Sequence, residues 1–356
     1  MATMRWSIFC RVVDNFGDIG FAWRLSADLA ARGETVRLVA DDRRALDWMA
    51  PAGAAGVEVL AWDDAAAASS DVLVETFGCG FPDRVEAELT GGTQRPVCIN
   101  VEHLSAEPFV ERSHGLPSPC FSEAGEKHTT WFFYPGFSER TGGLPREPGL
   151  TQRQRDFGDG REWLAAMGIE RREAERCVSL FCYRNPALGV LLDKLGEAPT
   201  LLLLTPGPAT EQAHALLGTS LRRGALRAVC LPALPQPDFD RLLWSCDLNF
   251  VRGEDSWVRA IWAGVPFAWQ IYPQDDGAHA AKLVAFLDRF LQGASAPLAA
   301  AVRATFAAWN GLGDIRAWPP LPDPTAWMLH CRLWREQLEA QPDLASNLLE
   351  FVASKR

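Results

Sequence analysis

The sequence has no segment apolar enough to span a bilayer and no pattern of a secretory signal peptide. Its nine cysteines are scattered without a C-x-x-C pair, and several lie in apolar runs where a free thiol behaves as a small hydrophobic group. Such a chain is expected in the reducing cytoplasm. The net charge of −10 argues against binding to nucleic acid and suits a basic protein as partner.

Several common functional motifs are also missing. No G-x-G-x-x-G follows the first predicted strand, which argues against the usual dinucleotide-binding fold, and there is no Walker motif. The nucleophile motif G-x-S-x-G is absent as well. The six histidines are dispersed without the spacing of metal ligands, so we expect no metal site.

The chain instead contains two series of strands that alternate with helices, which predicts two parallel sheets with helices on both faces. A length of 356 residues also suggests about two domains. Residues 104–149 are rich in proline and glycine and are interpreted as loops on the first domain. The predicted strands span 6–13, 35–40, 57–62, 71–77 and 96–101, then 177–183, 200–205, 226–231, 247–251 and 266–271.

The first candidate site is the turn between the first strand and the first helix, where Asp14 and Asp18 flank Gly17. In open α/β sheets this turn lies at the carboxyl end of the strands, where ligands bind. A helix start that binds phosphate is usually free of carboxylates, so this acidic turn is expected to meet a cation or to take a proton. The alternative is that Asp18 only caps the helix and Asp14 is an ordinary turn residue.

The second candidate site has the same layout of strand, short turn and helix, at residues 252–256. Asp255 or Ser256 is expected to cap this helix, which Gly264 and Pro266 end. The backbone N–H groups of the helix start, with Arg252 beside them, would bind a diphosphate. The alternative is that Arg252 simply pairs with Glu254.

Two further pairs of residues follow strands of the second series. Phe181 and Tyr183 come at the end of its first strand, where the Tyr183 hydroxyl is available to a ligand. Gln236 and Phe239 lie in a predicted Pro-rich loop, where the glutamine is suited to a pyrimidine edge and the ring to packing on the base. The alternative is that these side chains belong to the core.

The acidic turn with the following Trp23-Arg24-Leu25, together with residues 252–256, resembles the bacterial protein-arginine rhamnosyltransferases that modify elongation factor P, the EarP family. The resemblance runs from Trp6 to the C-terminus. It implies a GT-B fold, in which two Rossmann-like domains face each other across a cleft. The implied parts are an acceptor-side domain over 1–152 with 325–356 packing back on it, a connector over 153–176, and a nucleotide-sugar-binding domain over 177–324.

The resemblance also implies a reaction. L-rhamnose would move from the co-substrate dTDP-β-L-rhamnose to an arginine of elongation factor P, with inversion at the anomeric carbon and without a metal or another cofactor. Asp18 matches the general base, Asp14 its companion carboxylate, and Glu254 a residue needed for activity. Substrate contacts are assigned to Asn15, Phe16, Gly17, Phe181, Tyr183, Gln236, Phe239, Arg252, Gly253, Asp255 and Ser256.

One feature departs from the family pattern, which places an aromatic residue shortly before the glutamine. Here Ala233, Leu234 and Pro235 precede Gln236, so either Phe239 takes more of the contact with the base or the donor binds more weakly. Two other functions remain open. They are a GT-B-type nucleotide-sugar epimerase without a protein acceptor and a non-catalytic nucleotide-sugar-binding protein, neither of which needs the paired carboxylates.

Overall fold

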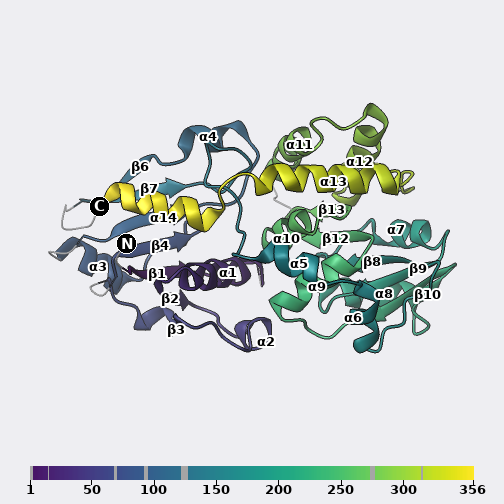
Figure 1. Cartoon of the computed structure of the whole chain (residues 1–356), viewed down its shortest axis with the longest axis horizontal. Helices are drawn as coiled ribbons and strands as arrows, with labels where there is room; N and C mark the ends of the chain where they lie inside the picture. The colour runs from purple at the N-terminus through teal and green to yellow at the C-terminus, as the bar shows by residue number, and fades with distance from the viewer. Residues whose placement is uncertain are drawn as a thin grey trace. The chain divides into compact units, whose positions relative to one another are not determined.

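The computed structural model describes residues 3–14, 16–67, 70–91, 95–121, 127–272, 277–313 and 316–356. The chain divides into two compact units. Unit 1 comprises Met1–Leu150 and Leu338–Arg356, and unit 2 comprises Thr151–Gln337. Figure 1 shows a sheet flanked by helices in each of them.

Unit 1 contains a seven-stranded sheet in the order β3-β2-β1-β4-β5-β7-β6. Neighbouring strands are parallel except β6 and β7. The strand order reverses between β1 and β4, which places a ligand site at their carboxyl ends. The strands are β1 Arg5–Cys10, β2 Thr35–Ala40, β3 Val57–Ala61, β4 Val72–Thr76, β5 Val97–Val101, β6 Pro117–Phe121 and β7 Lys127–Phe133; the helices are α1 Gly17–Ala31, α2 Leu46–Met49, η1 Trp62–Asp64, α3 Asp83–Gly91 and α4 Pro108–Ser113.

The prediction of loops over 104–149 is wrong for three segments, which are the helix α4 and the strands β6 and β7. β7 is an inner strand of the sheet, parallel to β5, and β6 pairs with it in the antiparallel sense. Pro117 and Pro119 lie in β6, which is the edge strand, and proline is tolerated there because one side of the strand needs no ladder hydrogen bonds. Because proline is uncommon in strands, these residues led to the prediction of loops instead of the strand pair.

Unit 2 contains a six-stranded sheet in the order β10-β11-β9-β8-β12-β13, parallel except for the pair β10–β11. The predicted connector 153–176 belongs to this unit. The strands are β8 Arg176–Leu180, β9 Thr200–Leu204, β10 Arg222–Arg223, β11 Leu226–Cys230, β12 Leu248–Arg252 and β13 Phe267–Gln270. The helices from the connector onward are α5 Leu150–Asp156, α6 Gly160–Ala166, α7 Leu188–Leu195, α8 Pro208–Leu217, α9 Gln236–Ser245, α10 Asp255–Ala263, α11 Ala278–Phe290, α12 Ala296–Trp309 and α13 Pro324–Glu339.

The last helix, α14 Leu344–Lys355, returns to unit 1 (yellow in Figure 1). Asp343 caps it by accepting from the Ser346 N–H at 2.9 Å, and Arg32, the C-cap of α1, donates to the same carboxylate at 2.8 Å. Leu344 and Leu348 are fully buried in the core of unit 1. Of the predicted returning segment 325–356, only the part from Leu338 therefore belongs to unit 1, while most of α13 belongs to unit 2.

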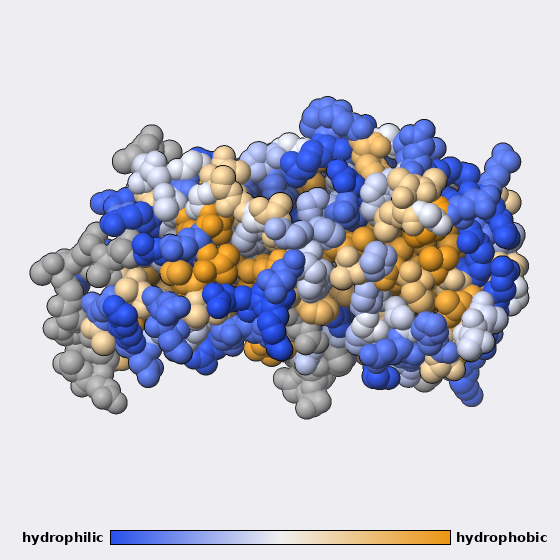
Figure 2. Space-filling view, turned by 90° about the horizontal axis from the view of Figure 1, so that it is seen from below, coloured by the Kyte–Doolittle hydropathy of each residue, from blue (hydrophilic) through white to orange (hydrophobic). Residues whose placement is uncertain are grey.

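Neither the helices nor the cysteines add an unexpected feature. In the described ranges, every helix is too short or too polar to cross a membrane. All nine cysteines are free thiols. Hydrophobic side chains also reach the surface, as the orange areas among blue polar residues in Figure 2 show, and the most exposed of the large ones is Val13 at 83%.

Replacing Leu348 tests how α14 stabilises unit 1. Leu348→Ala removes a fully buried side chain and should lower the free energy of unfolding by about 2–5 kcal/mol, because a cavity remains. Leu333→Ala is the control, since Leu333 is 49% exposed on α13, and its effect should stay below about 0.5 kcal/mol. Urea unfolding measures both variants, and equal losses would show that α14 is not part of the core.

Candidate active site

The acidic turn of unit 1 lies between β1 and α1, on the side of the sheet where the strand order reverses. Asp18 is in the first turn of α1, and its Oδ2 accepts hydrogen bonds from the backbone N–H groups of Val13 at 2.8 Å and Asp14 at 2.9 Å. The N-cap residue is Phe16, not Asp18. The carboxylate therefore reaches back from the helix and closes the preceding loop, a role that differs from a simple cap.

Asp18 is 8% exposed, and its surroundings act on its pKa in both directions. Burial raises the pKa above its ordinary value, and the nearby charge of Asp14 raises it further. The two backbone N–H groups and His103 lower the pKa, but burial dominates. A buried carboxylate with a raised pKa is a better proton acceptor than one in water, which suits a general base.

Gly17 brings the Asp14 carboxylate close to the start of α1. A Cβ atom at Gly17 would lie 3.0 Å from Asp14 Oδ2, and the Gly17 N–H donates to the Asp14 carbonyl at 2.7 Å. Phe16 is half-buried and packs edge-to-face on Trp48, with ring centroids 5.1 Å apart. Asn15, the remaining predicted contact in this turn, lies outside the described residues.

The structure adds two residues that the sequence did not suggest. Phe77 directly follows β4 and has a left-handed backbone, with φ +59°. His103 follows β5 and stacks flat on Phe77, with centroids 4.2 Å apart and planes 8° apart. Phe77 also contacts Phe21 of α1, one helical turn beyond Asp18. The only available sequence signal was their position at the ends of predicted strands, because Phe77 ends the predicted strand 71–77 and His103 follows the predicted strand 96–101.

In unit 2, Arg252 lies at the end of β12 with its guanidinium against two aromatic rings. Its Cζ is 4.5 Å from the ring centroid of Phe181 and 4.4 Å from that of Tyr183. The residue is 4% exposed, and its buried Nη1 has no hydrogen-bond partner among the described residues. A buried cation of this kind favours an anionic ligand.

The start of α10 lies directly after this arginine. Its N-cap is Glu254, whose side chain makes no capping bond, so the prediction that Asp255 or Ser256 caps the helix is wrong. The Ser256 hydroxyl instead donates to the Arg252 carbonyl and accepts from the Arg252 N–H at 3.1 Å. Gly253 turns the chain with φ +59°. An α10 start without a side-chain cap leaves backbone N–H groups that an anion can accept from. Glu254 and Asp255 make this start acidic, so it differs from the carboxylate-free helix starts that usually bind phosphate.

The predicted end of α10 is confirmed. Gly264 is the C-cap with φ +64°, in the left-handed conformation that favours glycine. A Cβ atom there would lie 2.9 Å from an Arg335 nitrogen.

Gln236 and Phe239 lie in the first turn of α9, so the prediction of a Pro-rich loop over 234–239 is wrong at its C-terminal part. Pro235 is the N-cap of this helix. Proline is tolerated at a helix start because the first N–H groups have no partner within the helix. Spaced by three residues, Gln236 and Phe239 share one helix face. Phe239 contacts Phe181 edge-on, with centroids 5.6 Å apart.

These contacts form a continuous row of side chains, in which Phe181 and Tyr183 enclose Arg252. The row continues from Tyr183 to Tyr272, whose ring is edge-on at 5.4 Å and whose side chain is 52% exposed. Tyr272 follows β13 and was not predicted. The backbone N–H of Tyr183 donates to Gln270 Oε1 at 2.9 Å, which ties the row to that strand.

A buried ion pair connects the two helices that carry these residues. Arg259 of α10 donates from Nε and Nη2 to the two oxygens of Asp240 of α9, at 2.8 and 2.7 Å. Both side chains are almost fully buried. Asp240 is one turn beyond Gln236 and Arg259 is one turn beyond Asp255, so the pair sets α9 against α10 close to the candidate site.

Comparison with known proteins identifies the kind of enzyme that the chain is similar to. The model of a family described as elongation factor P (EF-P) rhamnosyltransferase EarP matches residues 6–353. A protein-arginine rhamnosyltransferase of Pseudomonas aeruginosa is 41% identical over 374 residues, which cover 98% of each chain. A solved structure that describes EarP-mediated arginine glycosylation of translation elongation factor EF-P has a TM-score of 0.70 at 33% identity, covering 99% of this chain and 100% of that one.

A more distant likeness concerns the fold alone. The Arabidopsis thaliana glycosyltransferase UGT89C1, solved with UDP-L-rhamnose, has a TM-score of 0.54 at 11% identity over 99% of both chains. Together with the two α/β sheets, these likenesses establish a two-domain, GT-B-like α/β fold, as predicted. Among the described residues, no group of three or more His, Cys, Asp or Glu side chains is arranged to hold a metal ion, and metal independence stays a prediction.

The Asp240–Arg259 pair should make a large contribution to the stability of unit 2. Arg259→Met leaves Asp240 buried without this bidentate partner and should lower the free energy of unfolding by about 3–5 kcal/mol, whereas the double variant Asp240→Leu/Arg259→Met should recover most of that loss. Arg303→Met breaks the more exposed pair with Asp288 and should change stability by less than about 1 kcal/mol. Equal effects of Arg259→Met and Arg303→Met in urea unfolding would contradict the assignment.

Proposed function

Because the chain belongs to the family of elongation factor P rhamnosyltransferases, we propose that it transfers L-rhamnose from dTDP-β-L-rhamnose to one arginine of translation elongation factor P. The reaction inverts the anomeric carbon and needs no metal. The observation that carries the proposal is Arg252, a buried guanidinium whose Nη1 has no hydrogen-bond partner in the described part of the chain, beside a helix start without a side-chain cap. Such a place accepts the diphosphate of a nucleotide sugar.

The acidic turn of unit 1 supplies the complementary chemistry for a cationic acceptor. The pKa of an arginine lies far above neutrality, so full deprotonation at pH 7 would need about 9 kcal/mol, at roughly 1.36 kcal/mol per pKa unit. A single carboxylate is too weak a base to remove this proton in a separate step before the attack. In our proposal Asp14 and Asp18 hold the guanidinium and localise its charge, and the proton passes to Asp18 while the nitrogen attacks the oxocarbenium-like carbon.

The donor side then stabilises the leaving group. Arg252 and the N–H groups at the start of α10 receive the charge that develops on dTDP when the glycosidic bond breaks. Gly253 and Asp255 place the backbone for this contact, and Ser256 holds the turn through its bonds to Arg252. Glu254, at the N-cap, is the third proposed catalytic residue and faces the sugar.

Recognition of the base falls to the first turn of α9. Gln236 reads the pyrimidine edge, and Phe239, which already contacts Phe181, packs on the base in place of the missing aromatic residue at 233–235. Tyr183 offers its hydroxyl to the donor. The whole donor site is therefore assigned to residues that contact one another within unit 2.

The direct test is incubation of the purified chain with dTDP-β-L-rhamnose and elongation factor P from the same cell, followed by intact-mass and peptide mass spectrometry. The proposal expects a gain of one deoxyhexose on one arginine. A changed sugar nucleotide in a mixture without protein acceptor would indicate an epimerase instead. Tight donor binding without any product would indicate a binding protein.

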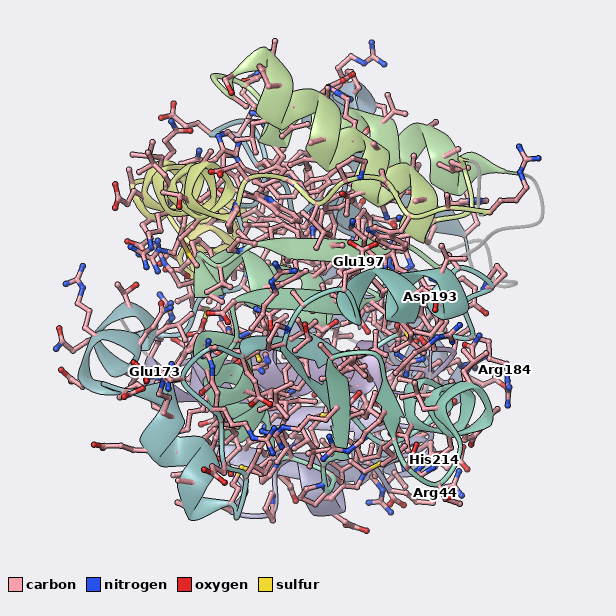
Figure 3. The ribbon with its side chains drawn as sticks, turned by 90° about the vertical axis from the view of Figure 1, so that its right-hand side faces the viewer. Arg44, Glu173, Arg184, Asp193, Glu197 and His214 are labelled. Carbon is pink, nitrogen blue, oxygen red and sulfur yellow. The ribbon has the colours of Figure 1, made fainter. Side chains whose placement is uncertain are left out.

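Asp18→Asn tests the general base. The amide keeps an oxygen to accept from the Val13 and Asp14 N–H groups, so the fold should persist, whereas turnover should fall by about 10²-fold or more. Asp193→Asn is the control, since Asp193 is an exposed surface residue of α7 (Figure 3). Near-normal turnover of a folded Asp18→Asn variant would end the assignment.

The same carboxylate predicts how activity depends on pH. Asp18 must be ionised to accept the proton, and burial raises its pKa above the ordinary value. The kcat/KM for the acceptor should therefore fall as the pH drops through that raised pKa, above the usual range of a solvated aspartate, which is near 3.9. Initial rates from pH 4.5 to 8 measure this acid limb, and a flat profile over that range would contradict the prediction.

Arg252→Lys tests the donor site. Lysine keeps the charge but loses the planar guanidinium that lies against Phe181 and Tyr183, so KM for the donor should rise by about 10-fold or more. Arg184→Lys is the matched control, because Arg184 is an exposed arginine of unit 2 paired with Glu211 (Figure 3). An unchanged donor KM for Arg252→Lys would remove Arg252 from the site.

A further inference from the structure

A tryptophan of β13, a strand that pairs with β12, is bonded to the turn that follows Arg252. The indole Nε1 of Trp269 donates a hydrogen bond to the Gly253 carbonyl at 2.7 Å. In the sheet, Trp269 lies in register with Val251, the residue before Arg252. The side chain of one strand therefore holds the backbone of the turn that follows its neighbour.

Two other aromatic rings fix the orientation of this indole. Trp269 stacks on Trp257 of α10, with ring centroids 3.7 Å apart and planes 4° apart, and meets Phe286 of α11 edge-on at 5.8 Å. Trp257 and Trp269 are 1% and 3% exposed. A closely packed, buried ring keeps a single orientation, so the indole N–H points in a fixed direction.

The hydrogen bond from Trp269 sets the direction of one peptide group in the turn. The peptide bond between Gly253 and Glu254 is trans, and in a trans peptide the C=O and the following N–H point in opposite directions. Because the Gly253 C=O points to the buried indole, the Glu254 N–H points away from it. Glycine has access to many backbone conformations, so this peptide group needs an external contact to keep one direction.

Burial of a tryptophan in unit 2 does not by itself require such a bond. Among the described residues, the Nε1 atoms of Trp309, Trp318 and Trp327 are buried without a hydrogen-bond partner. The paired Nε1 of Trp269 is bonded to the turn 252–256, which carries the proposed contacts with the diphosphate. The location of this bond points to a role in the site in addition to packing.

We propose that Trp269 is a positioning residue for the donor diphosphate. Its indole holds the Gly253 carbonyl, and the Glu254 N–H on the other side of the same peptide group donates to a phosphate oxygen. The inference rests on the proposed function, in which the turn 252–256 binds the diphosphate of a nucleotide sugar. Trp269 acts through Gly253 and does not contact the donor, and a hydrogen bond to a charged phosphate depends strongly on the direction of the N–H.

Trp269→Phe tests this role, because phenylalanine keeps an aromatic ring against Trp257 but has no N–H to donate. The Kd for dTDP should rise by about 10-fold, since the N–H that donates to the charged phosphate loses its alignment. The Kd for thymidine, which has no phosphate, should change by less than about 2-fold. Calorimetry measures dTDP binding, ligand-observed NMR measures thymidine binding, and in turnover the donor KM should rise while the acceptor KM stays unchanged.

Trp327→Phe is the matched control. It removes the same atoms from another buried tryptophan of unit 2, whose Nε1 has no hydrogen-bond partner in the described part of the chain. This variant should bind dTDP and thymidine as the wild type does. A packing defect in Trp269→Phe would weaken both ligands alike, and that result overturns the proposal, as do unchanged dTDP binding by Trp269→Phe and a selective loss of dTDP binding by Trp327→Phe.

A measurement on the wild-type chain decides the question if Trp269→Phe does not fold. In NMR spectra of the isotope-labelled protein, addition of dTDP should shift the signals of the Glu254 backbone N–H and of the Trp269 indole N–H, because the two groups lie on opposite sides of one peptide group. Thymidine should leave both signals in place. If dTDP moves neither signal, or if thymidine moves them equally, the proposal is wrong.

These measurements also separate the inference from the proposed function. If the wild-type chain binds dTDP but transfers no rhamnose to elongation factor P, the proposed function fails, and the comparison of dTDP with thymidine still decides the role of Trp269. If the wild-type chain transfers rhamnose and Trp269→Phe binds dTDP normally, only the role of Trp269 fails. A wild-type chain that does not bind dTDP would contradict both.

Discussion

A buried guanidinium that lies against two aromatic rings is the constraint on which the site of unit 2 depends. Removing Arg252 from water is unfavourable by several kcal/mol, and the π faces of Phe181 and Tyr183 offset only part of that loss. The Nη1 of Arg252 has no hydrogen-bond partner among the described residues, and the start of α10, which carries Glu254 and Asp255, follows it directly in the chain. An anionic ligand that accepted a hydrogen bond from Nη1 would therefore stabilise unit 2 on binding.

In unit 1 a negatively charged side chain, Asp18, lies in the same kind of turn between a strand and a helix. Asp18 is nearly buried, and two backbone N–H groups of the preceding loop hold one of its oxygens. Both sites follow a strand near the middle of a parallel sheet, because the carboxyl ends of such strands point loops and helix starts to one edge. The short turns need small residues, which explains Gly17 beside Asp14 and Gly253 after Arg252.

In each unit an ion pair holds a helix that carries part of a candidate site. In unit 2 the Asp240–Arg259 pair holds α9 against α10, so that the residues proposed for the base and for the diphosphate keep a fixed spacing. In unit 1 Arg32 joins α1 to the cap of α14 through Asp343. A site of a few polar groups needs such support, because displacement by about 1 Å is enough to weaken catalysis.

The sequence by itself determined the alternation of strands and helices and the place of both candidate turns. All ten predicted strands are present within a few residues, because buried parallel strands are apolar along their whole length. Only the tertiary structure revealed the strand β7 and its proline-containing partner β6, the start of α9 at Gln236, and the N-cap at Glu254. It also decided which side chains meet: Phe77 and His103 are distant in sequence, and whether Arg252 has a partner depends on residues that folding brings around it. Local patterns record propensity and periodicity, whereas burial and charge pairing are properties of the packed chain.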